Sequence, residues 1–262
     1  MDREGMDPDH LNLNSPGLAR RSMLISLCAF ATAGCGRAGE PDVAVAPPID
    51  DLVSPMPAAG TPPDKIVTML GDSITAGYGL PAADALPAQL EKTLKAMGLA
   101  VRVRAAGVSG DTSAGGLVRV DSSVQADTDL CIVALGGNDM LQGIDPLAVR
   151  ANLRSIIDKL QARDIPVLLA GMKAPPQYGR YATDFDRIFT DLAREDNVPA
   201  YPFLLNGVAL DRRYNQADGI HPNAEGVKVI VTGLAPTVAK LLAPSPVTIP
   251  RGNSGALVND RG

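Results

Sequence analysis

The chain has 262 residues, enough for one domain with a sizeable core and additional tails. Its 29 Asp and Glu residues exceed its 24 Lys and Arg residues, and the formal net charge of −5 argues against a nucleic-acid-binding surface. Aromatic residues make up 3% of the chain and tryptophan is absent, so a platform for stacking bases is not expected either.

The first 35 residues are predicted to be an export signal. Arg20 and Arg21 precede a short apolar stretch, Met23 to Phe30, which is too short to span a bilayer as a permanent helix. Small residues follow and end in Thr-Ala-Gly-Cys, which resembles a bacterial lipobox in which Cys35 is acylated and becomes the mature N-terminus. We therefore expect an exported protein, either periplasmic or anchored to a membrane as a lipoprotein. A plain signal peptide is the alternative.

Two further features of this region bear on export. The paired arginines also resemble a twin-arginine signal, and Met6 is an alternative start. Cysteine use is consistent with export without disulfides. Cys28 would leave with the signal and Cys35 would carry lipid, whereas Cys131 lies in an apolar run and is predicted to be a small buried hydrophobe.

The remaining chain divides into three predicted parts. Residues 36–64 are rich in Pro and Ala and show no amphipathic period, which is typical of a semi-extended linker. Residues 65–243 form the predicted folded domain. Residues 244–262 are predicted to be a flexible C-terminal tail.

Short apolar runs alternate with stretches of helical period in the folded domain. Five strands are predicted, over Ile66–Leu70, Val101–Ala106, Leu130–Leu135, Val167–Met172 and Ala200–Phe203. The third and fourth are continuously apolar, as expected of parallel strands that are covered on both faces. The alternation predicts an α/β fold in which a doubly wound parallel sheet is built with right-handed crossovers.

Apolar stripes at helical spacing mark three of the intervening helices. One has Asp145 as its cap and Pro146 at its first helical position. A second is predicted to begin at a capping box formed by Thr183 and Asp186. The last extends over residues 227–241.

Four polar clusters follow or flank these elements where ligands bind in such sheets, at the carboxyl ends of the strands. The clusters are residues 71–73, 107–112, 136–139 and 218–221. Each is a weak signal alone, because Gly-Asp-Ser and glycine pairs are common in turns. Together they predict one site, since each supplies a group that the others lack.

The first and last clusters contain the parts of a nucleophilic hydrolase. Ser73 is the candidate nucleophile, and its hydroxyl needs a base at neutral pH. His221 is the only histidine in the folded domain and could take that proton and deliver it to a leaving group. Asp218, three residues earlier, could bind the remote ring nitrogen and fix the tautomer. Asp72 is a competing candidate but adjoins the nucleophile.

The middle clusters supply donors for an oxyanion. The backbone N–H groups of Ser73 and Gly110 and the side-chain amide of Asn138 are the available set. No Walker loop or dinucleotide fingerprint follows a strand, so we expect no cofactor. One histidine without a cysteine cluster makes a catalytic metal site equally unexpected.

These blocks resemble those of the SGNH, or GDSL-type, hydrolases. Gly-Asp-Ser, the glycine at 110, Gly-x-Asn-Asp and Asp-x-x-His occur in the family's order and span nearly all of the folded domain. The resemblance implies a flavodoxin-like three-layer α/β/α sandwich with a five-stranded parallel sheet. It also implies a triad of Ser73, Asp218 and His221, and an oxyanion hole of Ser73, Gly110 and Asn138.

Within that family the chain is similar to the acyl-thioesterase/lysophospholipase/arylesterase branch. The similarity rests on Leu-Gly-Asp-Ser-Ile-Thr-Ala-Gly-Tyr-Gly, Ser-Gly-Asp-Thr-Ser, Leu-Gly-Gly-Asn-Asp and Asp-Gly-Ile-His-Pro-Asn. It implies a serine esterase that cleaves acyl esters or thioesters through an acyl-enzyme. Leu86 stands where the branch has an aromatic residue, and residues 140–144 also depart from its pattern, so acyl preference stays open.

Two other functions were weighed. A carbohydrate O-acetylesterase would keep the mechanism, and a polar groove would favour it, whereas an apolar channel near residues 140–146 and 173–181 would favour the esterase that cleaves acyl esters or thioesters. A lipoprotein that only binds ligands would not need the full set of catalytic groups, since losing one typically costs about 100-fold or more in rate. The expected partners are a small acyl substrate and, through Cys35, a membrane.

Overall fold

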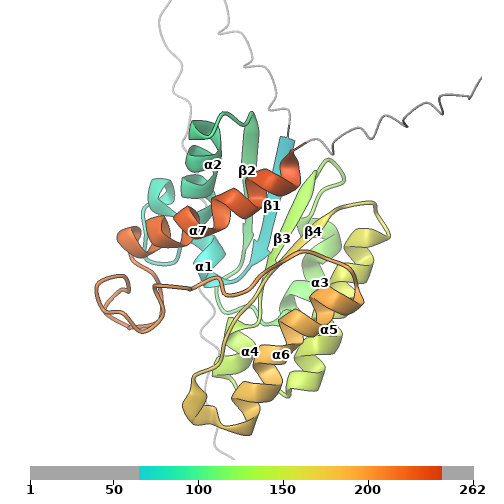
Figure 1. Ribbon diagram of the computed structural model, residues 1–262, viewed down its shortest axis with the longest axis vertical. Coiled ribbons are helices and arrows are strands. Elements are labelled where there is room, and N and C mark those ends of the chain that lie inside the picture. The colour runs from blue at the N-terminus through green and yellow to red at the C-terminus, as the bar shows by residue number, and fades with distance from the viewer. Residues whose placement is uncertain (1–64, 244–262) are drawn as a thin grey trace, which may run out of the picture. The chain divides into compact units, whose positions relative to one another are not determined.

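Five parallel strands form one sheet in the order β2-β1-β3-β4-β5 (Figure 1). The computed structural model describes residues 65–243. The predicted signal segment with Cys35, the linker and the C-terminal tail lie outside the described residues. The strands are β1 (Lys65–Gly71), β2 (Val101–Gly107), β3 (Leu130–Ala134), β4 (Val167–Ala170) and β5 (Ala200–Tyr201). The predicted five-stranded parallel sheet is thus confirmed.

Helices cover both faces of this sheet. The chain passes from β1 out to β2, then returns to β3 on the other side of β1, and right-handed crossovers therefore place the helices on opposite faces. On one face lie α2 (Leu86–Ala96) and α7 (Ala224–Leu242). On the other lie α3 (Ser113–Ser123), α5 (Pro146–Gln161) and α6 (Arg180–Glu195). The reversal between β1 and β3 is the switch point at which open α/β sheets bind ligands.

Short elements lie at the carboxyl end of the sheet or lead into the longer helices. They are α1 (Ser73–Ala76), η2 (Ala82–Asp84), α4 (Gly137–Leu141) and η3 (Pro176–Tyr178). Two of them, α1 and α4, begin directly after β1 and β3. None of the helices between Lys65 and Ala243 is long and apolar enough to cross a membrane.

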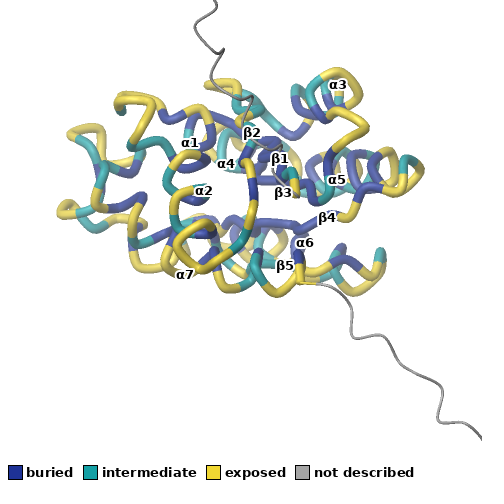
Figure 2. Tube along the Cα trace, turned by 90° about the horizontal axis from the view of Figure 1, so that it is seen from above, coloured by how far each residue is buried: buried dark blue, intermediate teal, exposed yellow. Residues whose placement is uncertain are grey.

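The core lies between the sheet and its two helical layers (Figure 2). Every residue of β3 is buried, as its continuous apolar run predicted, and fully burying one such side chain contributes roughly 1.5–3 kcal/mol. Cys131 lies in this strand with no exposed surface, and burial raises the pKa of its thiol to about 12. The prediction that Cys131 is a buried hydrophobe is confirmed.

Three strands are shorter than predicted. β3 ends at Ala134 rather than Leu135, β4 at Ala170 rather than Met172, and β5 at Tyr201 rather than Phe203. The apolar pattern continues beyond β3 and β4 because loop residues also pack into the core, where Leu135 is fully buried and Met172 is only 4% exposed. Beyond β5, Pro202 is exposed and Phe203 is half-buried. The pattern therefore recorded burial correctly at β3 and β4 but overstated strand pairing at all three ends.

The two predicted helix starts had different outcomes. Asp145 caps α5 as expected, because its Oδ1 accepts the N–H of Leu147 at 3.0 Å. The predicted capping box of Thr183 and Asp186 is wrong, since α6 begins at Arg180. Asp186 instead accepts the N–H of Ala174 at 2.8 Å, in the loop after β4. The first turn of α6 has no side-chain cap, and its apolar contacts stabilise the start of the helix instead.

Candidate active site

Ser73 lies two residues beyond the end of β1, where the buried strand passes into α1. The residue before it, Asp72, caps this short helix by accepting the N–H of Ile74 at 3.0 Å. Ser73 itself is 8% exposed. Its carbonyl accepts the N–H of Tyr78 at 3.0 Å, which closes the turn after the helix. The serine therefore has a fixed backbone at the switch point of the sheet.

The three residues predicted as a triad lie in mutual contact. Nε2 of His221 is 2.9 Å from Oγ of Ser73, and Nδ1 of the same ring is 2.7 Å from Oδ2 of Asp218. Oδ1 of Asp218 accepts the backbone N–H of His221 at 3.0 Å. The hydrogen bond from the imidazole is the largest of the contacts that lower the pKa of Asp218 to about 2. A carboxylate that stays ionised can orient the ring, and the ring can then accept the serine proton.

Asp72, the competing aspartate, occupies a different environment. It is 2% exposed and accepts a hydrogen bond from Ile74, not from the imidazole. Burial raises its pKa to about 6, although the bond from Ile74 and the positive charge that His221 can carry both oppose the rise. The aspartate that contacts the imidazole is therefore Asp218, and Asp72 caps the helix that carries the serine.

His221 lies on a hairpin that leads into α7. The backbone N–H of Gln216 donates to the carbonyl of His221 at 2.8 Å, across the hairpin. Oδ1 of Asn223 caps α7 by accepting the N–H of Gly226 at 3.0 Å. The ring of Tyr78 packs on the imidazole, with centroids 4.6 Å apart and planes tilted by 38°.

The predicted oxyanion donors come from the three segments that follow β1, β2 and β3: Ser73 begins α1, Gly110 lies in a turn and Asn138 lies in α4. Ser73 and Asn138 line one pocket, whereas Gly110 lies in an exposed turn beside it with φ +86°. Nδ2 of Asn138 donates to the carbonyl of Asp111 at 2.9 Å, which ties the asparagine to the turn that contains Gly110. Nδ2 carries two hydrogens, so this bond leaves one for a ligand.

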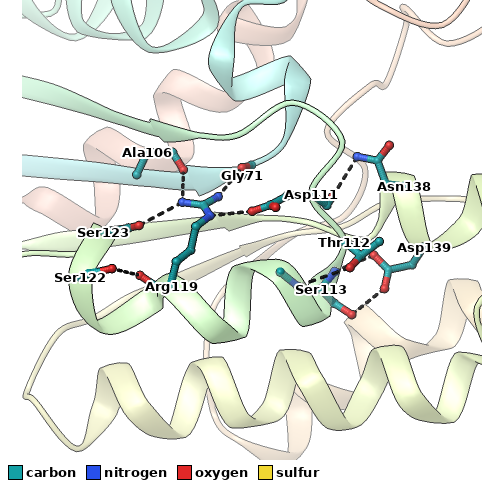
Figure 3. A network of polar contacts seen from close by, with 11 residues as sticks. Gly71, Ala106, Asp111, Thr112, Ser113, Arg119, Ser122, Ser123, Asn138 and Asp139 are labelled. Carbon is teal, nitrogen blue, oxygen red and sulfur yellow. Dashed lines mark hydrogen bonds and ion pairs between the residues drawn. The ribbon is translucent and has the colours of Figure 1, made fainter. Parts of the chain in front are cut away.

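Arg119 binds the segments that carry Ser73 and Gly110, and it was not predicted from the sequence (Figure 3). Its guanidinium donates to the carbonyls of Gly71 at 2.7 Å and Ala106 at 2.9 Å, and its Nε lies 2.6 Å from Oδ2 of Asp111. It therefore joins the ends of β1 and β2 to the turn that Asn138 contacts.

A second buried network holds the segment that carries Asn138. Asp139 is 1% exposed, and its carboxylate accepts the backbone N–H and the hydroxyl of Ser113 at 2.7 and 2.6 Å. The Ser113 hydroxyl also accepts the amide of Asn152 at 3.0 Å. The bonds between Ser113 and Asp139 connect α3 to α4 (Figure 3), and the bond from Asn152 connects them to α5. A buried carboxylate with such partners is a stable anchor for its neighbour.

The pocket beside Ser73 has a volume of about 140 Å³. Apolar side chains line most of it: Ile74, Met140, Leu141, Met172, Phe203, Leu205 and Ile220. Lys173 also lines the pocket, and its Nζ lies 5.7 Å from the centre of the Phe203 ring. Of the two segments predicted to line an acyl channel, 140–146 contributes two residues and 173–181 only Lys173. Phe203 and Leu205 were not predicted.

No metal site accompanies these groups in the part of the chain that the structure describes. Within residues 65–243, no three His, Cys, Asp or Glu side chains are grouped closely enough to hold a metal ion. The chemistry that the pocket offers comes from a hydroxyl, an imidazole, a carboxylate and amide donors.

Comparison with known proteins gives consistent similarities. Residues 69–229 match the model of the GDSL-like lipase/acylhydrolase family. Esterase TesA of Pseudomonas aeruginosa is 39% identical over 180 residues, covering 68% of this chain and 90% of that protein. Thioesterase 1/protease 1/lysophospholipase L1 of Escherichia coli strain K12 is 36% identical over 176 residues, covering 66% and 83%. The crystal structure of AlinE4, an SGNH-hydrolase family esterase, has a TM-score of 0.57 and 42% identity, covering 69% and 97%.

The burial of Asp72 predicts a pH-dependent gain of stability on Asp72→Asn. The folded-state pKa of about 6 exceeds the ordinary value of 3.8, so the folded protein loses stability as pH rises from about 4 through 6. Asparagine keeps the capping oxygen but does not ionise. The free energy of unfolding of Asp72→Asn, relative to wild type, should therefore increase by about 2 kcal/mol between pH 4 and 7.

Urea denaturation at several pH values measures this difference. Asp127→Asn is the control, because Asp127 is an exposed carboxyl whose pKa Arg104 lowers, the opposite direction to the shift at Asp72. It should not show the gain. A constant difference between Asp72→Asn and wild type from pH 4 to 7 would contradict the prediction.

Proposed function

Because the chain belongs to the GDSL-like lipase/acylhydrolase family and is a serine ester hydrolase, we propose that it cleaves acyl esters or thioesters through an acyl-enzyme on Ser73. One observation carries this proposal. The hydroxyl, imidazole and carboxylate of Ser73, His221 and Asp218 form a continuous hydrogen-bonded chain with links of 2.9 and 2.7 Å. That geometry gives a serine the base it needs and gives the base its orientation.

Each group has a proposed role in the reaction. His221 takes the proton of Ser73 as its oxygen attacks the acyl carbonyl carbon, and the negative charge moves to the carbonyl oxygen. The N–H groups of Ser73 and Gly110 and the amide of Asn138 donate to that oxygen. His221 then protonates the leaving alcohol or thiol, and a water repeats the sequence to release the acid. Asp218 keeps the imidazole in the required tautomer throughout.

The pocket supports an acyl group of modest length. Its lining is mostly apolar, and each buried CH₂ contributes roughly 0.8 kcal/mol until the pocket is full. The volume of about 140 Å³ is small beside pockets that enclose drug-sized ligands. We therefore propose short to medium acyl esters or thioesters as the preferred substrates. The names of the E. coli and P. aeruginosa relatives, a thioesterase/lysophospholipase and an esterase, support the same substrate class.

Export is a further part of the proposal. The Arg20-Arg21 pair, the apolar stretch and the Thr-Ala-Gly-Cys sequence support a periplasmic enzyme or a lipoprotein anchored through Cys35. An enzyme held on a membrane by lipid would meet acyl esters at that surface.

A covalent label tests the proposed nucleophile. An organophosphonate should react once, at Ser73, and abolish turnover, because no other serine within residues 65–243 has His221 as its base. Mass spectrometry of the digested adduct locates the label. Ser73→Ala should lose at least about 1,000-fold in kcat/KM and should not be labelled. Full activity in Ser73→Ala, or an adduct on another residue, would show that the nucleophile is assigned wrongly.

A panel of p-nitrophenyl esters from acetate to palmitate, with acyl-CoA thioesters alongside, tests the proposed substrates. The apolar lining predicts that kcat/KM rises from acetate to butyrate or hexanoate by about 3-fold or more per added CH₂ and then falls once the pocket is filled. A maximum at acetate, together with hydrolysis of O-acetylated glycans, would favour a carbohydrate O-acetylesterase instead. Ligand binding without turnover of any ester would favour a lipoprotein that only binds.

Detergent partitioning tests the proposed anchor. If Cys35 carries lipid, the protein should enter the detergent phase, and Cys35→Ser should be soluble with unchanged kcat/KM, because the pocket lies in the folded domain. Intact-mass measurement of the mature N-terminus identifies the processed residue. Processing at another position without lipid would leave an ordinary secreted hydrolase.

A further inference from the structure

The side chain of Gln216 joins the two loops that hold the proposed nucleophile and base. Ser73 and His221 are 148 residues apart and belong to separate segments, the turn after β1 and the hairpin before α7. Nε2 of Gln216 donates to the carbonyl of Tyr78, in the first segment, at 2.7 Å. It also donates to the carbonyl of Pro222, in the second, at 3.0 Å. Both amide hydrogens are used.

These contacts complete a closed ring of hydrogen bonds. Tyr78 donates its N–H to the carbonyl of Ser73 at 3.0 Å, and its own carbonyl accepts from Gln216. The N–H of Gln216 donates to the carbonyl of His221 at 2.8 Å. The imidazole of His221 then lies 2.9 Å from the hydroxyl of Ser73, where the ring closes. Gln216 is the member of the ring that bridges the two loops without taking part in the proposed chemistry.

The rest of the triad does not need this bridge. Asp218 and His221 lie on the same hairpin, and Asp218 accepts both the ring N–H and the backbone N–H of His221. The contact between Asp218 and His221 therefore does not depend on the side chain of Gln216. The distance that other contacts must fix is the one from the imidazole to Ser73, which lies on the turn after β1.

Gly79 shows how closely the two loops meet at the amide of Gln216. Gly79 has φ +72°, and a Cβ built on it would lie 2.2 Å from Oε1 of Gln216. Any side chain at position 79 would have to displace the Gln216 amide. The neighbouring ring of Tyr78 packs on the imidazole, so the same loop contacts His221 on its ring face.

We propose that Gln216 is a positioning residue that sets the separation of Ser73 and His221, an inference that rests on the proposed role of Ser73 as the nucleophile. Reacting groups displaced by about 1 Å can lose about 100-fold in rate. Loss of the Gln216 amide should therefore lower kcat by about 10- to 100-fold while KM, which depends on the apolar pocket, changes by less than about 3-fold.

The main experiment compares Gln216→Met with Gln89→Met in the purified protein. Gln89 donates to the carbonyl of Ala83 at 2.6 Å and so also makes a side-chain to main-chain bond, but beside α2 and away from the pocket. Three properties are measured for each: kcat and KM on p-nitrophenyl butyrate, the rate of phosphonylation at Ser73, and the urea midpoint. Gln216→Met should lose kcat and phosphonylation rate together, whereas Gln89→Met should keep both.

The NMR signal of the His221 Nδ1 proton provides a readout that separates positioning from unfolding. In Gln216→Met this downfield proton should persist, because its partner Asp218 lies on the same hairpin. If the signal persists while phosphonylation is slow, Asp218 and His221 are still hydrogen-bonded, but the imidazole no longer lies at the correct distance from Ser73. A kcat and a phosphonylation rate within about 2-fold of wild type would overturn the proposal.

A second pair of variants approaches the same contact from the other loop. Gly79→Ala and Gly98→Ala both place a side chain at positive φ, +72° and +89°. The Cβ at 98 meets nothing within 4 Å, whereas the Cβ at 79 meets Gln216. Gly79→Ala should therefore lose kcat as Gln216→Met does, and Gly98→Ala should keep it. Equal kcat in the two alanine variants would count against the proposal even if Gln216→Met does not fold.

The same labelling experiment distinguishes an error in the proposed function from an error in the role of Gln216. If wild type is not phosphonylated at Ser73, the nucleophile is wrong and the role of Gln216 falls with it. If wild type is labelled at Ser73 and Gln216→Met is labelled at the same rate, only the inference about Gln216 is wrong.

Discussion

The hydrogen bond between Ser73 and His221 is the contact on which the rest of this site depends, because it joins two segments that share no helix or strand. A serine hydroxyl is activated only when a base lies within hydrogen-bond reach, so both partners must be held to within about 0.5 Å. The sheet holds the serine, since β1 has neighbouring strands on both sides. The histidine lies on a hairpin, and side-chain to main-chain bonds from Gln216 and Asn223 support it instead.

The carboxyl end of the sheet buries charged groups, and their different partners give them different properties. Asp139 receives a backbone N–H and a hydroxyl from Ser113 and serves as a fixed anchor. Asp72 is buried as deeply but receives only the N–H of Ile74, so burial dominates and raises its pKa to about 6. Arg119 satisfies carbonyl groups where β1 and β2 end. The carbonyl of Gly71 also accepts the N–H of Val108 at 3.0 Å, so Arg119 adds a second donor where β1 ends.

The fold was predictable because a buried parallel strand leaves a continuous apolar run, and β3 is buried along its whole length. Three of the four polar clusters were predictable because they follow β1, β2 and β3, and the fourth, residues 218–221, because it contains the lone histidine of the folded domain beside an aspartate. Sequence could not identify Arg119 or Gln216, since each binds main-chain carbonyls of another segment, at the ends of β1 and β2 for Arg119 and at Tyr78 for Gln216, and no residue type marks a carbonyl. The start of α6 was missed for a related reason: its first turn is held by packing, and the Thr183–Asp186 pair that resembles a cap serves another purpose. The pocket residues Phe203 and Leu205 follow β5, which has only two residues and a weak pattern.

Cys131 has a consequence for how the folded domain responds to its surroundings. Its thiol is enclosed in the central strand, and the raised pKa of about 12 keeps it protonated at any pH at which the enzyme would work. Oxidants and electrophiles react with the exposed thiolate, so the native domain resists sulfenic acid formation and mixed disulfides in an oxidising compartment. A reagent can modify this thiol only after β3 has separated from the rest of the sheet. The rate of that modification thus reports the opening of the whole domain rather than the fraying of a loop.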